Sequence, residues 1–277
     1  MESQGTAQPG AYLLGHTDGE IDRLVRQARL VDPITERIFR MAGVRSGMRV
    51  LDVGTGAGDV AFLVAAIVGP AGEVVGVDNA VVAIEAARHR AGERAISNVR
   101  FLAGEPGELE FDRPFDAVVG RYVLQFQPDP AAFLRGLTRH LRPGGLVVFH
   151  ELDWSGVASR PALPTFDRCC ALIVETMRRR GTETRMGGKL YPTFLAAGFQ
   201  PPMLHLEAIM AGGPHTALRM DLVAGLVRTL LPEIEQLGLA TAEELAVETL
   251  AQRMLAEAIE CSATIVAHHQ VGAWTSV

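Results

Sequence analysis

Between residues 48 and 153, short apolar runs rich in valine alternate with segments of helical length. The runs are MRVLDVG (48–54), EVVGVD (73–78), VRFLAG (99–104), FDAVVGR (115–121) and GLVVFHELD (145–153), and the helical segments are 59–68, 80–92 and 129–141. Runs this short and apolar are typical of parallel strands that are buried on both faces of a sheet. The alternation therefore predicts an α/β protein with a doubly wound, mostly parallel, Rossmann-like sheet of about seven strands.

The chain ahead of this core has a different pattern. Residues 1–10 are polar and contain Gly and Pro, as is typical of a tail. Apolar residues then recur at helical spacing from 17 to 31, and a second helix is predicted from about Pro33 to Ala42. Residues 1–45 are therefore predicted to form a tail followed by two helices.

Beyond Asp153 the alternation loosens. Helices are predicted at about 163–180 and 190–197, and a strand at 203–210. The stretch from His215 to Glu260 has apolar residues at helical spacing, and IVAHHQVGAWTSV (265–277) is predicted to be a last strand. The sequence thus predicts a Rossmann-like core over 46–212, a helical cap insertion over 213–258 and the last core strand within 259–277.

The sequence VLDVGTGAGDVA (50–61) places glycines at alternate positions directly after the first predicted strand. Such a loop brings backbone N–H groups and the positive end of a helix close to a ligand. The dinucleotide fingerprint G-x-G-x-x-G fails, because Asp59 stands in place of the third glycine. A phosphate-binding P-loop also fails, because the stretch contains no lysine. What remains is an acid followed by three alternating glycines, from Asp52 to Gly58.

This pattern resembles the first motif of the class I S-adenosylmethionine-dependent methyltransferases. The resemblance extends through NVRFLAGEPGELEF (98–111), FDAVVGRYVLQF (115–126) and LRPGGLVVFHE (141–151), and it covers about residues 48–153. The cofactor that it implies, S-adenosyl-L-methionine, carries a cationic sulfonium and an α-amino group. An acid beside the loop attracts these groups, whereas it would repel a pyrophosphate.

The resemblance also implies which residues bind the cofactor. Asp52 and the loop would hold the methionine end, Asp78 would accept hydrogen bonds from the ribose, and Gly104-Glu105 would meet the adenine. Glu105 departs from the Gly-Asp pair of the family, and an acid such as Asp78 is shared with NAD enzymes. The cofactor-binding residues expected in the core are Asp52, Gly54, Thr55, Gly56, Gly58, Asp78, Asn79, Gly104, Glu105 and Arg121.

The segment AYLLGHTDGEIDRLVRQARL (11–30) is similar to the N-terminal segment of small-molecule members related to the ubiquinone and menaquinone C-methyltransferases and to antibiotic-pathway enzymes. In those proteins the segment folds over the cofactor as a lid. The similarity implies lid contacts from Tyr12 and Gln27. The alternative is that both are surface residues of a helix.

Methyl transfer depends chiefly on holding the nucleophile and the sulfonium aligned in a dry pocket. Open α/β sheets bind ligands at the carboxyl ends of their strands, where Arg121 and Tyr122 follow the fourth predicted strand. His150, Glu151 and Asp153 at the end of the fifth are the candidate catalytic residues, and alternation puts His150 on the opposite face from the two acids. The alternative for Glu151 and Asp153 is a salt bridge or a cap of the next turn.

No metal is predicted. Catechol-type methyltransferases hold magnesium with acids at the ends of the fourth and fifth strands, but the fourth predicted strand here ends in Gly120-Arg121. The pair His268-His269 is predicted to be two ordinary strand residues, because neighbours on a strand point to opposite faces.

The net charge of −6 and the pI of about 5.8 remove the long-range positive field with which nucleic-acid binders gather phosphates. A small-molecule partner is therefore expected, and no nucleic acid. The start of the sequence has no secretory pattern, and no apolar stretch approaches 18 residues, so no membrane partner and a cytoplasmic location are expected.

The predicted function is transfer of a methyl group from S-adenosylmethionine to a small organic acceptor, quinone-like or of secondary metabolism. The alternatives are an NAD-dependent oxidoreductase, disfavoured by Asp59, and a module that binds the cofactor without catalysis. Apolar residues of the cap such as Met220, Leu226 and Leu230 could roof the active site. Alternatively, they bury the cap's own core or a homodimer contact.

Overall fold

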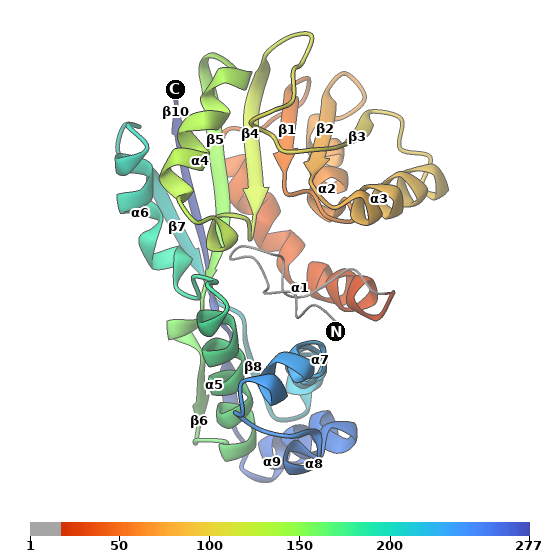
Figure 1. The fold of residues 1–277 in the computed structure, drawn as a ribbon, viewed down its shortest axis with the longest axis vertical. Coiled ribbons are helices and arrows are strands. Elements are labelled where there is room, and N and C mark those ends of the chain that lie inside the picture. Colours follow the sequence, from red (N-terminus) through yellow and green to blue (C-terminus); the bar gives the residue numbers. More distant parts are fainter. Residues whose placement is uncertain (1–17) are drawn as a thin grey trace, which may run out of the picture.

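A computed structural model describes the backbone of residues 18–277 and the side chains of Ala28 and residues 30–277. The main sheet has seven strands in the order β3-β2-β1-β4-β5-β10-β7 (Figure 1). They are β1 (Arg49–Val53), β2 (Glu73–Asp78), β3 (Val99–Ala103), β4 (Phe115–Arg121), β5 (Leu141–Asp153), β7 (Met203–Glu207) and β10 (His269–Ser276). Strands β1 to β5 pair in parallel, and β10 is antiparallel to both β5 and β7. The predicted α/β class and the mostly parallel, seven-stranded Rossmann-like sheet are confirmed.

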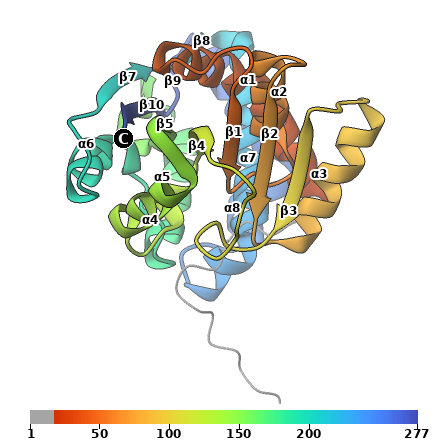
Figure 2. The ribbon, with the colours of Figure 1, turned by 90° about the horizontal axis from the view of Figure 1, so that it is seen from above.

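Helices cover both faces of this sheet (Figure 2). Those of the core are α1 (Asp18–Ala42), α2 (Asp59–Val68), α3 (Val81–Glu93), α4 (Pro130–Leu137) and α6 (Met186–Ala196). Side chains of α1, α2 and α3 share one apolar cluster with the sheet, and those of α4 and α6 share the cluster on the other face. Every residue of β1 is buried, as expected for a parallel strand covered on both sides.

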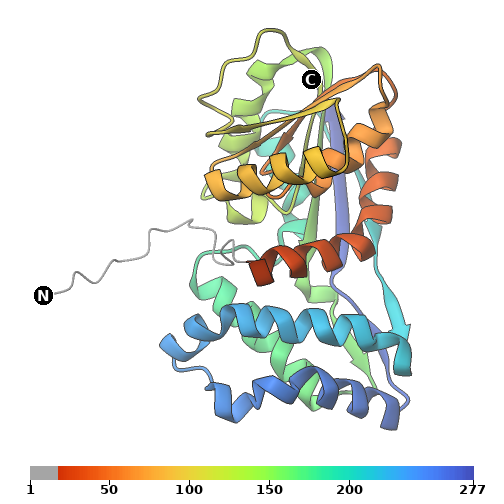
Figure 3. The ribbon, with the colours of Figure 1, turned by 90° about the vertical axis from the view of Figure 1, so that its right-hand side faces the viewer.

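A helical cap lies beyond the carboxyl ends of the parallel strands (Figures 1 and 3). Its helices are α5 (Pro164–Arg179), α7 (Ala217–Gln236), α8 (Ala242–Leu245) and α9 (Leu250–Glu260), and its small sheet consists of β6 (Ala158–Arg160), β9 (Thr264–Val266) and β8 (Met210–Gly212) in that order. The helices α5, α7 and α9 contact one another around their own apolar core. The cap also contacts the rest of the molecule through α7 and α1.

Short 3-10 turns link these elements: η1 (Leu124–Phe126), η2 (Thr138–His140), η3 (Trp154–Gly156), η4 (Gly213–Thr216) and η5 (Val247–Thr249). Within residues 18–277, no helix combines the length and the apolar composition that crossing a membrane requires.

The elements outside the core differ from the sequence-based expectation in three ways. Residues 33–42 continue α1 instead of forming a second helix, because the burial of Ile34 and Ile38 outweighs the N–H that Pro33 lacks. Helix α5, which precedes the predicted insertion 213–258, packs with the cap helices α7 and α9. The predicted last strand is divided, since β9 pairs in the small sheet and β10 in the main sheet.

Candidate active site

The carboxyl ends of β1, β2 and β4 point toward the cap (Figure 1), and the glycine loop lies at the first of these ends. Gly56 has a φ of +52°, and no heavy atom lies within 4 Å of the position that a Cβ would take there. Gly58 has a φ of +89°, and a Cβ there would lie 2.9 Å from Cζ of Phe101. A left-handed backbone therefore favours glycine at both positions, and at Gly58 close packing adds a steric requirement for it.

Asp52 lies on β1 at the base of this loop, and its side chain is buried. The Thr55 hydroxyl donates a hydrogen bond to Asp52 Oδ2 at 2.6 Å. The other carboxylate oxygen, Oδ1, is buried and has no hydrogen-bond partner among the described residues. Burial raises the pKa of Asp52 to about 7. An acid with an unsatisfied buried oxygen fits a ligand that brings a hydrogen-bond donor, such as an ammonium group.

Asp78 ends β2 and connects two loops. Its Oδ2 accepts a hydrogen bond from the Gly56 N–H, and its Oδ1 accepts one from the Ala80 N–H, both at 2.9 Å. The Asp78 carbonyl also accepts the Gly104 N–H at 2.9 Å, which brings the end of β3 to the same place. Each carboxylate oxygen keeps a free lone pair, so a ligand hydroxyl can still bind.

Next to Asp78, Asn79 donates a hydrogen bond through Nδ2 to Glu105 Oε1 at 3.0 Å, in an exposed position. The structure thus brings together the predicted residues of the loops after β1, β2 and β3. Glu105, which follows Gly104, reaches Asn79 although the family pattern has the shorter aspartate at this position.

Arg121, at the end of β4, contacts α1 and not the glycine loop. Its Nη1 donates to Asp32 Oδ1 at 2.7 Å and to the Thr35 hydroxyl at 3.0 Å. The pKa of Asp32 is raised, because burial outweighs the opposing effect of Arg121. The pair attaches α1 across the carboxyl ends of the strands. Gln27 lies on α1, but its side chain is outside the described part of the chain, as is the whole of Tyr12.

Glu151 is buried on β5 and holds the turn after β4. One of its oxygens, Oε1, accepts hydrogen bonds from the N–H groups of Val123 and Leu124, both at 2.8 Å. Burial raises the pKa of Glu151 to about 8. These contacts favour a positioning role in which Glu151 caps the turn η1.

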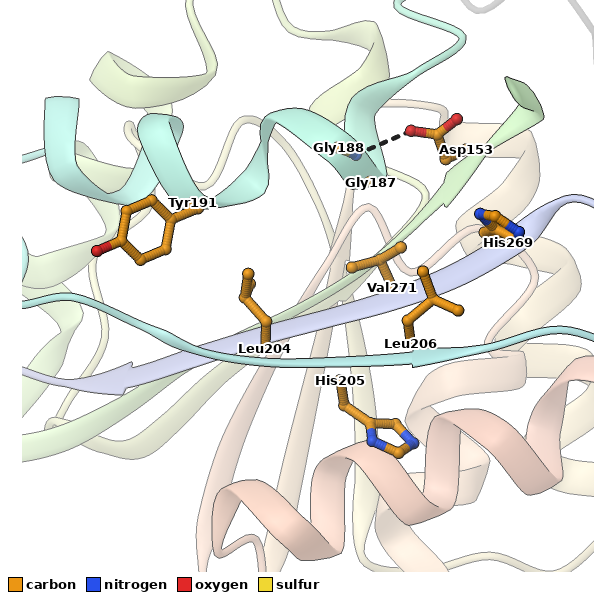
Figure 4. A pocket seen from close by; sticks show the side chains of 9 residues that line it. All are labelled: Asp153, Gly187, Gly188, Tyr191, Leu204, His205, Leu206, His269 and Val271. Carbon is orange, nitrogen blue, oxygen red and sulfur yellow. Dashed lines mark hydrogen bonds between the residues drawn. The ribbon is translucent and has the colours of Figure 1, made fainter. Parts of the chain in front are cut away.

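Asp153 caps the turn η3 and lies on the same face of β5 as Glu151. It accepts hydrogen bonds from the Ser155 N–H at 2.8 Å and from the Gly188 N–H at 3.0 Å. Figure 4 shows Asp153 at one end of a pocket of about 420 Å³ that is bordered by α6, β7 and β10. No residue of the glycine loop lines this pocket. Asp153 thus borders a pocket to which the glycine loop does not contribute.

His150 faces the opposite side of the sheet, toward α1, as the alternation along the strand predicts. Its Nδ1 lies 3.1 Å from the Thr35 hydroxyl. Burial lowers the pKa of His150 to about 3, so the ring is neutral at physiological pH. His150 is thus part of the contact that attaches α1.

A polar network between the core and the cap was not predicted. Tyr122 has a φ of +60°, and its hydroxyl donates to Gln270 Oε1 at 2.5 Å. Gln270 Nε2 in turn donates to His268 Nδ1 at 2.7 Å. Burial lowers the pKa of His268 to about 3, and its ring lies edge-on to Trp154 with 5.2 Å between the centroids. The sequence placed Tyr122 near the site, but nothing in it indicated that Gln270 lies across from Tyr122.

Four features together define a class I methyltransferase. They are a glycine loop with an acid at its base, an acid at the end of β2, a Gly-Glu pair after β3 and a sheet in which β10 is antiparallel. The chain belongs to the family described as "Methyltransferase domain", whose model matches residues 44–194. The predicted resemblance to S-adenosylmethionine-dependent methyltransferases is confirmed.

Curated relatives include the demethylmenaquinone methyltransferases of several Staphylococcus aureus strains, at 36% identity over 138 residues. The match covers 50% of this chain and 54% of those relatives, so the chain spans about half their length.

Among solved structures, the [4+2]-cyclase SpnF is similar with a TM-score of 0.52 at 22% identity, covering 87% of this chain and 80% of the other. The YcgJ protein of Bacillus subtilis is similar with a TM-score of 0.53 at 18% identity, covering 86% and 95% of the two chains. Both likenesses concern the fold.

Proposed function

We propose that the protein transfers a methyl group from S-adenosylmethionine to a small organic acceptor by in-line displacement. The observation that carries the proposal is the open left-handed loop at Gly56 above a buried acid, Asp52, that has an unsatisfied oxygen. The bound cofactor supplies an electrophilic methyl group: the acceptor's electron pair forms the new bond to carbon while the carbon–sulfur pair returns to the sulfonium sulfur. The rest of the chemistry is positioning and exclusion of water.

The residues after β1, β2 and β3 would share the binding of the cofactor. Asp52 offers its free Oδ1 to the α-amino group, with Thr55 fixing the other oxygen. Asp78 offers its remaining lone pairs to the ribose hydroxyls while it holds the glycine loop. Glu105, held by Asn79, would accept a hydrogen bond from the exocyclic amine of the adenine.

Arg121, Thr35 and His150 serve this site indirectly, because they attach α1 at the end of the sheet. Glu151 shapes the same region by holding the turn that begins at Tyr122. At neutral pH the Glu151 carboxyl is protonated, because its pKa is raised to about 8, and the His150 ring is a weak base, because its pKa is lowered to about 3. They support an acceptor that reaches the site with its nucleophile already deprotonated, or one that loses its proton to water.

The acceptor is proposed to be quinone-like or a related small aromatic compound. The support is the similarity to the demethylmenaquinone methyltransferases of Staphylococcus aureus, together with the packing of Tyr122, which follows β4, against the apolar core of the cap. Substrate selection on this fold depends on the shape of the acceptor pocket, so the class of acceptor is the part that requires direct assay.

Calorimetric titration of the protein with S-adenosylhomocysteine and with NADH tests the donor. S-adenosylhomocysteine is expected to bind, and Asp52→Asn to weaken that binding about tenfold through loss of a charge-assisted hydrogen bond. Glu85→Gln, an exposed acid on α3, is the matched control and should bind like the wild type. Preferential binding of NADH would contradict the proposal. Tight binding of S-adenosylmethionine with no turnover on any naphthoquinol or phenol would instead favour a non-catalytic module.

A further inference from the structure

Arg219, on the first turn of α7, is a half-buried cation without a counter-charge among the side chains that the structure describes. Its guanidinium forms no hydrogen bond or ion pair with the side chains that the structure describes. The groups that act on it electrostatically are Tyr122 and Cys170, and burial lowers its pKa. Removing a charge from water without a partner costs free energy, so such a position favours a ligand that brings the missing negative charge.

The three described groups that interact electrostatically with Arg219, namely Tyr122, Cys170 and His268, are neutral at physiological pH. Burial raises the pKa of Tyr122 to about 12 and that of the Cys170 thiol well above its usual value, and it lowers the pKa of His268 to about 3. Arg219 affects the pKa of both Tyr122 and His268, so the cation lies within electrostatic range of the Tyr122–Gln270–His268 network.

Trp154 provides a second, independent observation at this place. The residue is buried, its ring contacts His268, and its indole Nε1 has no hydrogen-bond partner among the described residues. A buried indole N–H usually finds an acceptor. Two donors that act on His268, Trp154 through ring contact and Arg219 through its charge, therefore lack acceptors among the described residues.

The network adjoins the candidate cofactor site. Val123 follows Tyr122, and its Cγ2 lies 2.7 Å from the position that a Cβ on Gly54 would take. Tyr122 also packs against the apolar core of the cap. A ligand beside Tyr122 would thus have the glycine loop on one side and apolar cap residues on the other.

We propose that Arg219 recognises the methyl acceptor by pairing with an anionic oxygen on it, a carboxylate or the ionised oxygen of a phenol or enol, with the Trp154 indole as a second donor. This inference rests on the proposed function, because it places the acceptor at the cofactor site. It narrows the substrate class to apolar organic anions. Such an acceptor also agrees with the lack of a free base at the site.

The test uses three aromatic probes added to the S-adenosylhomocysteine complex: 2-naphthoate, 4-nitrophenolate and the neutral 2-naphthamide. Calorimetry should give at least about tenfold tighter binding of one of the two anions than of the amide, the effect of one charge-assisted pair. Tighter binding of 2-naphthoate would identify the anionic oxygen of the acceptor as that of a carboxylate, and tighter binding of 4-nitrophenolate as that of an ionised phenol. Arg219→Gln should abolish the preference, and Arg219→Lys should keep part of it.

Arg228→Gln is the matched control, because Arg228 is exposed on the same helix. It should keep the anion preference, and all variants should bind S-adenosylhomocysteine like the wild type. Equal affinity of the wild type for anions and amide, or a preference that survives Arg219→Gln, would overturn the inference. Failure of S-adenosylhomocysteine to bind would instead refute the proposed function, so the two failures are distinguishable.

Discussion

The Arg121 guanidinium at the end of β4 lies 2.7 Å from the Asp32 carboxylate on α1. This ion pair joins two elements that are far apart in the sequence, and with Thr35 and His150 it attaches α1 at the place where the parallel strands end. Only 9% of the Arg121 side chain is exposed, against 34% for Asp32. The pair is thus shielded enough for its loss to be measurable.

Arg121→Ala should lower the free energy of unfolding by about 1–2 kcal/mol, because Asp32 and Thr35 lose a shared donor. Urea denaturation measures the change. Arg40→Ala is the control, since the Arg40–Glu36 pair lies on the surface of the same helix with 54% and 40% exposure. A loss from Arg40→Ala as large as that from Arg121→Ala would mean that the Arg121 contact does not attach α1.

Glu151 should make the cofactor-free protein less stable as the pH rises. Its folded pKa of about 8 lies above the ordinary value of 4.5, so the folded state holds a proton that the unfolded state has lost. The contribution of this proton to the stability of the folded state is complete below the ordinary pKa of 4.5 and is lost as the pH rises through about 8. Asp52, with a pKa of about 7, acts in the same direction.

Replacing Glu151 with Gln should therefore flatten the pH dependence of the free energy of unfolding by more than about 1 kcal/mol over this range. Glu151→Gln also keeps an oxygen for the Val123 and Leu124 N–H groups, whereas Glu151→Ala should cost about 2 kcal/mol at every pH. Urea unfolding at a series of pH values gives both quantities, with exposed Glu248→Gln as the control. An unchanged slope in Glu151→Gln would show that the folded carboxyl is already ionised.

The glycine loop should respond differently to alanine at its two left-handed positions. Gly58→Ala adds a contact of 2.9 Å with Phe101 to the backbone strain, so a loss of about 2–3 kcal/mol is expected. Gly56→Ala meets no neighbouring atom and should cost about 1 kcal/mol, yet its methyl group would project where the cofactor is proposed to bind. Thermal unfolding and titration with S-adenosylhomocysteine separate the two effects. Normal cofactor affinity in Gly56→Ala would place the ligand elsewhere.

Asp78→Ala should weaken cofactor binding by about 2 kcal/mol, which is about 30-fold in affinity. Because Asp78 also accepts the Gly56 and Ala80 N–H groups, some stability should be lost with it. Asp129→Ala is a matched control, since Asp129 accepts the Ala132 N–H at the start of α4 in an exposed position. It should lose stability without losing affinity, and calorimetry compares the two variants. Unchanged affinity in Asp78→Ala would contradict the ribose assignment.

Helices and strands of the core whose apolar pattern is local could be predicted from the sequence. The helix predicted over 59–68 coincides with α2, and the strands predicted over 73–78 and 115–121 coincide with β2 and β4. Because parallel strands end at one edge of the sheet, the acids Asp52 and Asp78 could also be placed together from the sequence alone.

Contacts between distant segments were not predictable in the same way. Tyr122 and Gln270 are separated by 148 positions, and their hydrogen bond depends on the antiparallel register of β10 against β5. The role of Glu151 depends on the turn that follows Tyr122, a non-glycine residue with a positive φ. Helical periodicity likewise carries no information about a cation such as Arg219, whose surroundings come from β4, α5 and the chain before β10.

The position of β10 between β5 and β7 has a consequence for biosynthesis. On the ribosome, β7 is made about sixty residues before β10, its neighbour in the main sheet. Until His269–Ser276 emerges, the nascent chain exposes two unpaired edges, that of β5 and that of β7, together with the apolar residues that β10 covers. Premature termination ahead of β10 would therefore yield an aggregation-prone product and not a smaller working enzyme.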